Sequence, residues 1–375
     1  MRKYLTRIGR GGVRYGFVTP AVLSFLFALQ PTGTALAGSS SKEKEEKRSV
    51  EVRGESRIYV KNTRGKTIIV GRKDVGSVLV RAYKYVRAKD SKTAAKWMDE
   101  LEVEVDTDGE QISVVTRHPE QIGRGGSFWS FIRGIRHRAY VDYTIEVPNS
   151  FDAKVASTSG DIQITSLDGS VRLFGSSGDV FLKDIGGKTF IELSSGDIEV
   201  RNIREDLRVR MSSGDADVRE IGGSLGIQGT SGDVKAYGIG GDADVELSSG
   251  SIVLRGCGGD AITKTISGNG EITDVKGNLK AVATSGDLIV SLLPVGEREY
   301  VLKTSSGDVI VSFDGSRDYG FLMEVTTSSG SIEGDLDIKL DKISRKMLRG
   351  VVGSGDGRLY IETASGDIRI KQVGN

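Results

Sequence analysis

Apolar and polar residues alternate along short segments from Val50 to the C-terminus, and glycine-containing turns separate these segments. In the second half of the chain a Ser-Gly dipeptide recurs every 18 residues, from Gly160 to Gly286. Apolar residues stand two and four positions after these glycines, as at Ile162 and Ile164, with Gly270 as the exception. Alternation with a period of two is typical of strands that have one buried face and one solvated face.

A second glycine column follows nine residues after the first, so each 18-residue unit consists of two halves with a turn each. Glycine, aspartate, asparagine and serine are the residues that tolerate the conformations of tight turns. We therefore expect a structural turn column, formed by the Ser-Gly glycine and the residue after it. Its members are Gly160, Asp161, Gly178, Asp179, Gly196, Asp197, Gly214, Asp215, Gly232, Asp233, Gly286 and Asp287.

A unit of two short strands and two turns cannot bury its own apolar face, whereas stacked units can. The sequence predicts an all-β fold, a parallel β-solenoid or β-helix with coils of about 18 residues, one short N-terminal helix and a hairpin insertion. A β-sandwich is the alternative, since hairpins also give short alternating strands. The looser spacing of Gly307, Gly330 and Gly366 predicts insertions in the last coils. Cys257 occupies an inward position and is expected to be buried.

The first 37 residues have the layout of a secretory signal peptide. Five basic residues and no acids precede an apolar stretch from Ala21 to Leu29, and small residues stand at Ala35 and Ala37. We expect cleavage after Ala37, and an uncleaved N-terminal anchor is the alternative. The predicted organisation is a signal peptide at 1–37, a polar linker at 38–49, a β-rich region at 50–150 and the Ser-Gly-Asp solenoid at 151–375.

The β-rich region contains a helical pattern and an unusual loop. Asp90 is placed to cap a helix whose residues Ala94, Trp97, Met98 and Leu101 share one face. A glycine- and arginine-rich segment then follows, and it also carries aromatic residues. This candidate binding loop could contact an anionic polymer or lipid headgroups, or its rings could fold back onto the sheet. Its candidate contact residues are Arg124, Phe128, Trp129, Phe131, Arg133, Arg136 and Arg138.

The Ser-Gly-Asp-Ile units, the segment from Val141 to Pro148 that leads into them and the closing segment from Gly353 to Ile368 carry a family resemblance. The chain resembles the bacterial "putative adhesin" β-strand-repeat family, which is a domain of unknown function, from about Val50 to the C-terminus. The resemblance implies an exported, envelope-associated β-solenoid with a link to envelope stress. It implies no catalytic residues.

Motifs for catalysis, metals or cofactors do not occur in the sequence. Only one Cys and two His are present, and there is no Gly-x-Ser-x-Gly, Walker or His-Glu-x-x-His motif. The aspartates of the turn column could form a cation ladder, or each could accept backbone N–H bonds within its own coil. The periodicity favours the second interpretation. We expect no cofactor, no metal site and no enzymatic activity, with a polysaccharide lyase-like or glycosidase-like enzyme as the alternative.

The charge balance argues against nucleic acid as a partner. Without the five basic residues of the leader, the 52 basic residues fall to 47, against 51 acids. Nucleic-acid-binding proteins normally carry a basic excess. The expected protein is an exported, adhesin-like binding scaffold in the periplasm, at the cell surface or secreted. Its expected partner is an envelope protein or glycan, with a peripheral membrane contact through the candidate binding loop.

Overall fold

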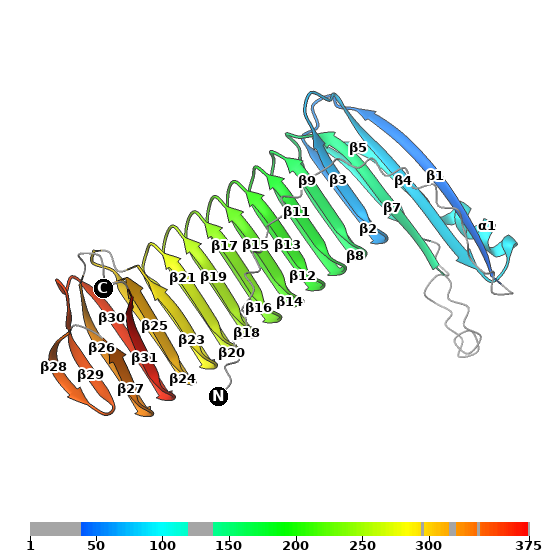
Figure 1. Ribbon diagram of the computed structural model, residues 1–375. Coiled ribbons are helices and arrows are strands. Elements are labelled where there is room, and N and C mark those ends of the chain that lie inside the picture. The colour runs from blue at the N-terminus through cyan, green and yellow to red at the C-terminus, as the bar shows by residue number, and fades with distance from the viewer. Residues whose placement is uncertain (1–38, 119–137, 294–295, 315–319, 336–337, 374–375) are drawn as a thin grey trace, which may run out of the picture. The chain divides into compact units, whose positions relative to one another are not determined.

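The computed structural model describes residues 39–118, 138–293, 296–314, 320–335 and 338–373. The chain from Gly38 to Asn375 forms one compact unit. In its described part the unit consists of two long β-sheets and the helix α1 (Ser91–Glu100) (Figure 1). The predicted all-β class is therefore confirmed.

The first sheet, which we call sheet A, has 15 strands. In spatial order they are β1 (Ser40–Glu51), β4 (Ser77–Ala88), β7 (Arg138–Pro148), β3 (Thr67–Arg72), β9 (Ile162–Leu167), β11 (Val180–Ile185), β13 (Ile198–Ile203), β15 (Ala216–Ile221), β17 (Val234–Ile239), β19 (Ile252–Cys257), β21 (Gly270–Val275), β23 (Leu288–Leu292), β25 (Val309–Asp314), β31 (Ile368–Val373) and β27 (Ile332–Asp335).

The second sheet, which we call sheet B, has 16 strands. In spatial order they are β28 (Lys339–Ser344), β29 (Met347–Val352), β26 (Phe321–Ser329), β30 (Gly357–Ser365), β24 (Glu299–Ser306), β22 (Leu279–Ser285), β20 (Ala261–Ser267), β18 (Ala243–Ser249), β16 (Leu225–Ser231), β14 (Leu207–Ser213), β12 (Thr189–Ser195), β10 (Val171–Ser177), β8 (Asp152–Ser159), β2 (Arg57–Arg64), β6 (Gln111–Arg117) and β5 (Glu102–Asp108).

Each regular coil contributes one strand to each sheet, and equivalent strands pair in parallel with a shift of one repeat. Val180 pairs with Ile198 in sheet A, and Val171 pairs with Thr189 in sheet B. These partners are 18 residues apart, which confirms the predicted β-solenoid and excludes the β-sandwich. Stacking satisfies the backbone hydrogen bonds of each coil through its two neighbours.

The core lies between the two sheets and consists of the inward-facing apolar residues of every coil. Leu182, Val200 and Val218 are fully buried in successive strands of sheet A. Cys257 is only 1% exposed, as expected from its column, and burial raises the pKa of its thiol. This cysteine therefore fills space in the core.

The two ends of the stack depart from sequence order. Near the N-terminus, the coil of β2 and β3 lies between the strands β6 and β7 on one side and β8 and β9 on the other. Near the C-terminus, the last coil, β30 and β31, lies between β24 and β25 and the earlier coil of β26 and β27. The prediction that insertions explain the irregular spacing was therefore incomplete, because the order of the coils also changes.

Antiparallel strands cover the ends of the stack. At the N-terminal end β1, β4 and β7 pair antiparallel, as do β5 and β6. Asp90 caps α1 by accepting a 2.7 Å hydrogen bond from the Thr93 N–H, and the helix buries the predicted residues Ala94, Trp97 and Met98. At the C-terminal end, the hairpin β28–β29 is added to β26.

Candidate binding surface

The glycines of the turn column adopt a backbone conformation that favours glycine. Gly196 has a φ of +126°, and a Cβ atom added there would lie 2.2 Å from the carbonyl oxygen of Gly178 in the preceding coil. Gly214 and Gly232 are in the same situation relative to the coil before them. Both the positive φ and the close approach of neighbouring coils therefore require glycine.

The aspartates of the turn column link one coil to the next. The Asp161 carboxylate accepts a hydrogen bond from the Asp179 N–H at 3.1 Å, and Asp179 accepts one from Asp197 at 3.0 Å. Asp197 and Asp215 continue the series with bonds of 2.9 and 2.8 Å. The expectation of bonds within each coil was wrong, because the turn N–H of the next coil is the donor that stacks directly against each carboxylate.

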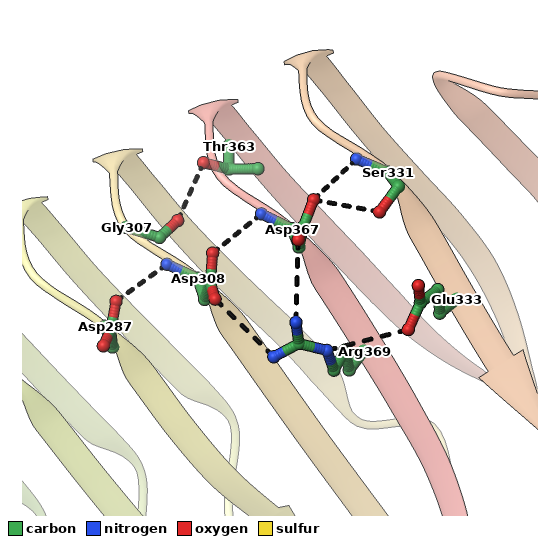
Figure 2. Close-up of polar contacts among 8 residues, drawn as sticks. All are labelled: Asp287, Gly307, Asp308, Ser331, Glu333, Thr363, Asp367 and Arg369. Carbon is green, nitrogen blue, oxygen red and sulfur yellow. Dashed lines mark hydrogen bonds and ion pairs between the residues drawn. The ribbon is translucent and has the colours of Figure 1, made fainter.

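The same ladder continues through the irregular C-terminal coils (Figure 2). Asp287 accepts from the Asp308 N–H at 2.8 Å, Asp308 accepts from Asp367 at 2.8 Å, and Asp367 accepts from Ser331 at 2.9 Å. Arg369 lies below this row, with ion pairs to Asp308, Asp367 and Glu333. Hydrogen bonds from Ser331 lower the pKa of Asp367. The ladder therefore joins β31 to both of its neighbours although the coils are out of sequence order.

A second ladder runs along the other edge of the coils, and the sequence analysis missed it. Asp206 accepts from the Ser224 N–H at 3.0 Å, and this bond together with Lys188 lowers its pKa. Asp242 accepts from Asp260 at 2.9 Å, and Asp260 accepts from Asn278 at 2.8 Å. The detectable signal is the Asp, Ser or Asn that follows most of the second-column glycines.

These carboxylate rows are not built as cation sites. Within the residues that the structure describes, no group of three or more His, Cys, Asp or Glu side chains is arranged to hold a metal ion. The rows are explained by the turn N–H groups that they accept from. The outward faces of the sheets are the remaining surfaces on which a binding site can lie.

The outward face of sheet B carries cations and aromatic rings in two adjacent rows over β2, β8, β10, β12 and β14. Strand register places Lys154 beside Arg172, Arg172 beside Phe190, and Phe190 beside Arg208. The sequence analysis did not identify these two rows as a candidate site. We call the combined feature the cationic–aromatic surface. It consists of Tyr59, Lys61, Lys154, Arg172, Phe174, Phe190, Arg208 and Arg210.

The rings and cations of the cationic–aromatic surface contact one another. The Phe174 and Phe190 ring centroids are 5.8 Å apart. The Arg210 guanidinium lies 5.9 Å from the Phe190 centroid, and the Lys154 ammonium lies 5.5 Å from the Tyr59 centroid. Cation–π contacts at these distances hold the long side chains over the sheet.

The cationic–aromatic surface has a positive charge that its own strands do not neutralise. Glu192 is the one carboxylate within the two rows, and none of the five cations forms an ion pair with another described residue, although Asp206 lines the same hollow as Arg208. On sheet A, by contrast, Arg219 binds Asp217 through two bonds of 2.7 and 2.8 Å, and Arg255 binds Glu271. Four cations of the regular coils without an ion pair to a described residue, Lys154, Arg172, Arg208 and Arg210, therefore lie together on one half of one face, whereas Lys235, Lys276 and Lys280 lie singly on other coils.

Shallow hollows accompany the cationic–aromatic surface where glycines replace side chains. Gly226 follows Arg208 in the outward row, and the missing side chain leaves an open depression of about 720 Å³ that Phe190, Asp244 and Ile262 also line. A second hollow of about 290 Å³ lies over Gly175. A rigid sheet with open hollows, rings and cations suits an extended anionic ligand better than a small enclosed one.

Most of the candidate binding loop predicted from sequence lies outside the described residues. This applies to Arg124, Phe128, Trp129, Phe131, Arg133 and Arg136. The remaining residue, Arg138, is exposed as the first residue of β7 and pairs across the sheet with Arg87. None of the helices in the described part of the chain is long and apolar enough to cross a bilayer.

Comparison with solved structures finds similar chains in three bacteria. One is a "putative cell adhesion protein" from Clostridium sporogenes, with 12% identity, a TM-score of 0.22 and coverage of 88% of this chain and 100% of that chain. A "putative adhesin" from Bacteroides fragilis has 12% identity, a TM-score of 0.21 and coverage of 87% and 97%. A "putative lipid binding protein" from Parabacteroides distasonis has 10% identity, a TM-score of 0.29 and coverage of 87% and 96%.

Comparison with curated proteins finds no match. A family model described as Toastrack DUF4097 matches residues 84–256 and 260–371. These residues include α1, nearly all of the regular coils, β30 and most of β31. The chain therefore belongs to the Toastrack DUF4097 family.

Proposed function

We propose that the protein is an exported, non-enzymatic binding scaffold of the bacterial cell envelope, and that its cationic–aromatic surface binds an anionic envelope glycan. The observation that carries the proposal is the set of five unpaired cations between three aromatic rings on one face of sheet B. Aromatic rings stack on sugar faces, and Arg and Lys donate charge-assisted hydrogen bonds to carboxylates or phosphates.

The spacing of the coils supports an extended ligand. Equivalent side chains of neighbouring coils lie about 4.8 Å apart along the stack. Lys154, Arg172 and Arg208 lie along one row, with Phe190 between the two arginines. A linear polyanion that runs along the stack meets a cation or a ring at each coil, so many weak contacts act together.

A glycan-binding measurement tests the proposal. The purified protein is titrated with polygalacturonate, a uronate-rich probe, and with neutral dextran as a control. We expect binding of the polyuronate only, weakened by added salt because exposed charges are screened. Arg172→Gln combined with Arg208→Gln should weaken binding roughly thirtyfold to several hundredfold, because two charge-assisted contacts of about 1–2 kcal/mol each are lost.

A matched control removes the same charge from the opposite face of the stack. Lys183 and Arg201 lie in the outward row of sheet A, and Arg201 is ion-paired with Glu199. The double variant Lys183→Gln, Arg201→Gln should bind as the unmodified protein does. Equal losses in both double variants, or no polyuronate binding at all, would refute the assignment of the glycan to this surface.

One observation keeps a carbohydrate-active enzyme as a second candidate. Asp244 lines the depression beside the cationic–aromatic surface, and burial raises its pKa, with a further contribution from the charge of Glu246. A carboxyl group with a raised pKa is the kind of general acid that glycosidases use. Product release from polygalacturonate that Asp244→Asn abolishes would support this candidate, and intact polymer after long incubation would exclude it for this substrate.

Two parts of the proposal rest on sequence alone. We propose that residues 1–37 are a secretory signal peptide, so N-terminal sequencing of the exported protein should begin at Gly38. We also propose that the candidate binding loop makes an additional peripheral contact with anionic lipid or glycan. Deletion of residues 119–136 should then weaken binding to envelope fractions, and unchanged binding would remove the loop as a contact site.

A further inference from the structure

At the C-terminal end of the stack, sheet B extends beyond sheet A. The outermost complete coil contributes β26 to sheet B and β27 to sheet A, and β27 is the last strand of sheet A. Sheet B continues with β29 and β28 (Figure 1). Two strands of sheet B therefore have no strand of sheet A opposite their inner face.

The inner face of these two overhanging strands is apolar and solvent-exposed. Leu348 of β29 is partly buried against the core. Its cross-strand partner Ile343 lies on the same face and is 66% exposed, and Leu340, the partner of the buried Gly350, is 50% exposed. Ile338 packs beside them. A cluster of large apolar side chains at a sheet edge is typical of an interaction surface.

The N-terminal end of the same chain shows how such an overhang is covered. There, the helix α1 packs on β1 and β4. It buries Trp97 and Met98 to 6% and 7% exposure. Among the described residues no helix or strand does the same for Leu340 and Ile343. The contrast indicates that the C-terminal overhang is completed by another molecule.

We propose that the overhang is covered by a second copy of this chain, in an end-to-end dimer. A two-fold axis parallel to the strands places the overhang of each copy opposite the overhang of the other. Each overhang is two strands wide. The overhang of one copy therefore fills the space beyond the last strand of the partner's sheet A, so that β28 of one copy lies next to β27 of its partner. Both sheets then continue across the interface with their backbone edges paired.

The charges of the two edges are complementary in this arrangement. Strand β28 carries Lys339 and Lys342, whereas its Asp341 is paired within the hairpin to Arg349 at 3.6 Å. Strand β27 carries Glu333 and Asp335, both exposed. Glu333 also lies 3.7 Å from Arg369 of its own copy. A basic edge therefore meets an acidic edge on both sides of the axis, which favours a second copy over an unrelated partner.

Sedimentation velocity of the purified protein over a concentration series tests the dimer. We expect reversible dimers in the unmodified protein. The double variant Leu340→Lys, Ile343→Lys should raise the dissociation constant by roughly tenfold or more, because buried apolar anchors at an interface centre become charged. Leu322→Lys is the matched control, since Leu322 is 49% exposed at the same end but on the outward face of sheet B. This control should dimerise normally.

A second measurement is independent of stability effects. Cys257 is the single cysteine of the chain and is buried, so an introduced surface cysteine would be the accessible thiol in the experiment. Ile343→Cys should be cross-linked to the same position of the partner by a bis-maleimide reagent about 10 Å long, because the two thiols face each other across the core, and Ile266→Cys, exposed on β20, should not. A protein that stays monomeric up to high concentration, or dimers unaffected by the Leu340→Lys, Ile343→Lys variant, would overturn the proposal and assign the overhang to another occupant.

Discussion

The turn glycines offer the most direct test of the stacked architecture. Gly196 lies between β12 and β13 in a regular coil, and we consider its replacement by alanine. The added Cβ would lie 2.2 Å from the Gly178 carbonyl oxygen and 2.7 Å from the carbon of that carbonyl. Real Cβ atoms do not approach backbone this closely, so the two coils must separate locally or shift.

Two terms contribute to the cost of Gly196→Ala. An alanine held at a φ of +126° is in a region that side chains rarely adopt, at about 1–3 kcal/mol. Forcing an extra methyl group against a neighbouring coil costs about 1–3 kcal/mol more. We expect a total loss of roughly 2–6 kcal/mol, which is a large fraction of the stability of an ordinary domain.

Chemical denaturation measures this loss, and hydrogen exchange locates it. Exchange should accelerate most in the coils on either side of residue 196, because each coil contacts only its neighbours. The control is Gly226→Ala, where the added Cβ has as its nearest neighbour the Arg208 side chain at 3.7 Å and φ is not in the positive region. A loss below about 1 kcal/mol for Gly196→Ala, or equal losses in both variants, would refute the reasoning.

Two further predictions concern the aspartate ladder. Asp215→Ala removes the acceptor for the Asp233 N–H and should lower the free energy of unfolding by about 1 kcal/mol, as loss of a helix cap does. Asp215→Asn keeps an acceptor and should have little effect. Equal losses for the two variants in a denaturant titration would point to a role for the charge itself. Asp142, which accepts from the Lys66 N–H, has a pKa raised mainly by burial, so its charged form destabilises the fold and stability falls as pH rises through that pKa. Asp142→Asn should therefore be more stable than the unmodified protein at pH 7, with a difference that closes as the pH falls through the carboxylate range. Thermal unfolding at several pH values measures this difference, and a constant difference across pH would contradict the assignment.

The repeat made most of the fold predictable. Each coil contacts its neighbours through equivalent positions 18 residues apart, so a local pattern repeated along the chain specifies both the strands and their parallel register. Asp90, Trp97 and Met98 were likewise predictable, because a cap and an amphipathic face are local signals. The second hydrogen-bond ladder was visible in principle at the residues after the second-column glycines.

Other signals were missed or were absent. A third column with a period of 18 has a left-handed backbone conformation one residue before an inward position, and most of its members are Asp, Asn or Gly, the residue types that tolerate that conformation. Its members are Ser166, Asp184, Asn202, Glu220, Gly238, Gly256 and Asp274. The cationic–aromatic surface was also missed, because its residues come from five strands that are far apart in the sequence. Arg172 and Phe190 become neighbours only when the register of β10 and β12 aligns them.

By itself, the sequence determined the coil length, the two turns of each coil, the buried face and the place of Cys257, because these depend on residues within one repeat and on its period. The tertiary structure alone decided the order of the terminal coils, the overhang of sheet B and the concentration of unpaired positive charge on one face. These features depend on which strands meet across long separations in sequence. Because the coils are similar, the energy of pairing one coil with another is nearly the same for different partners. The order of the terminal coils is therefore decided by the packing of the whole stack.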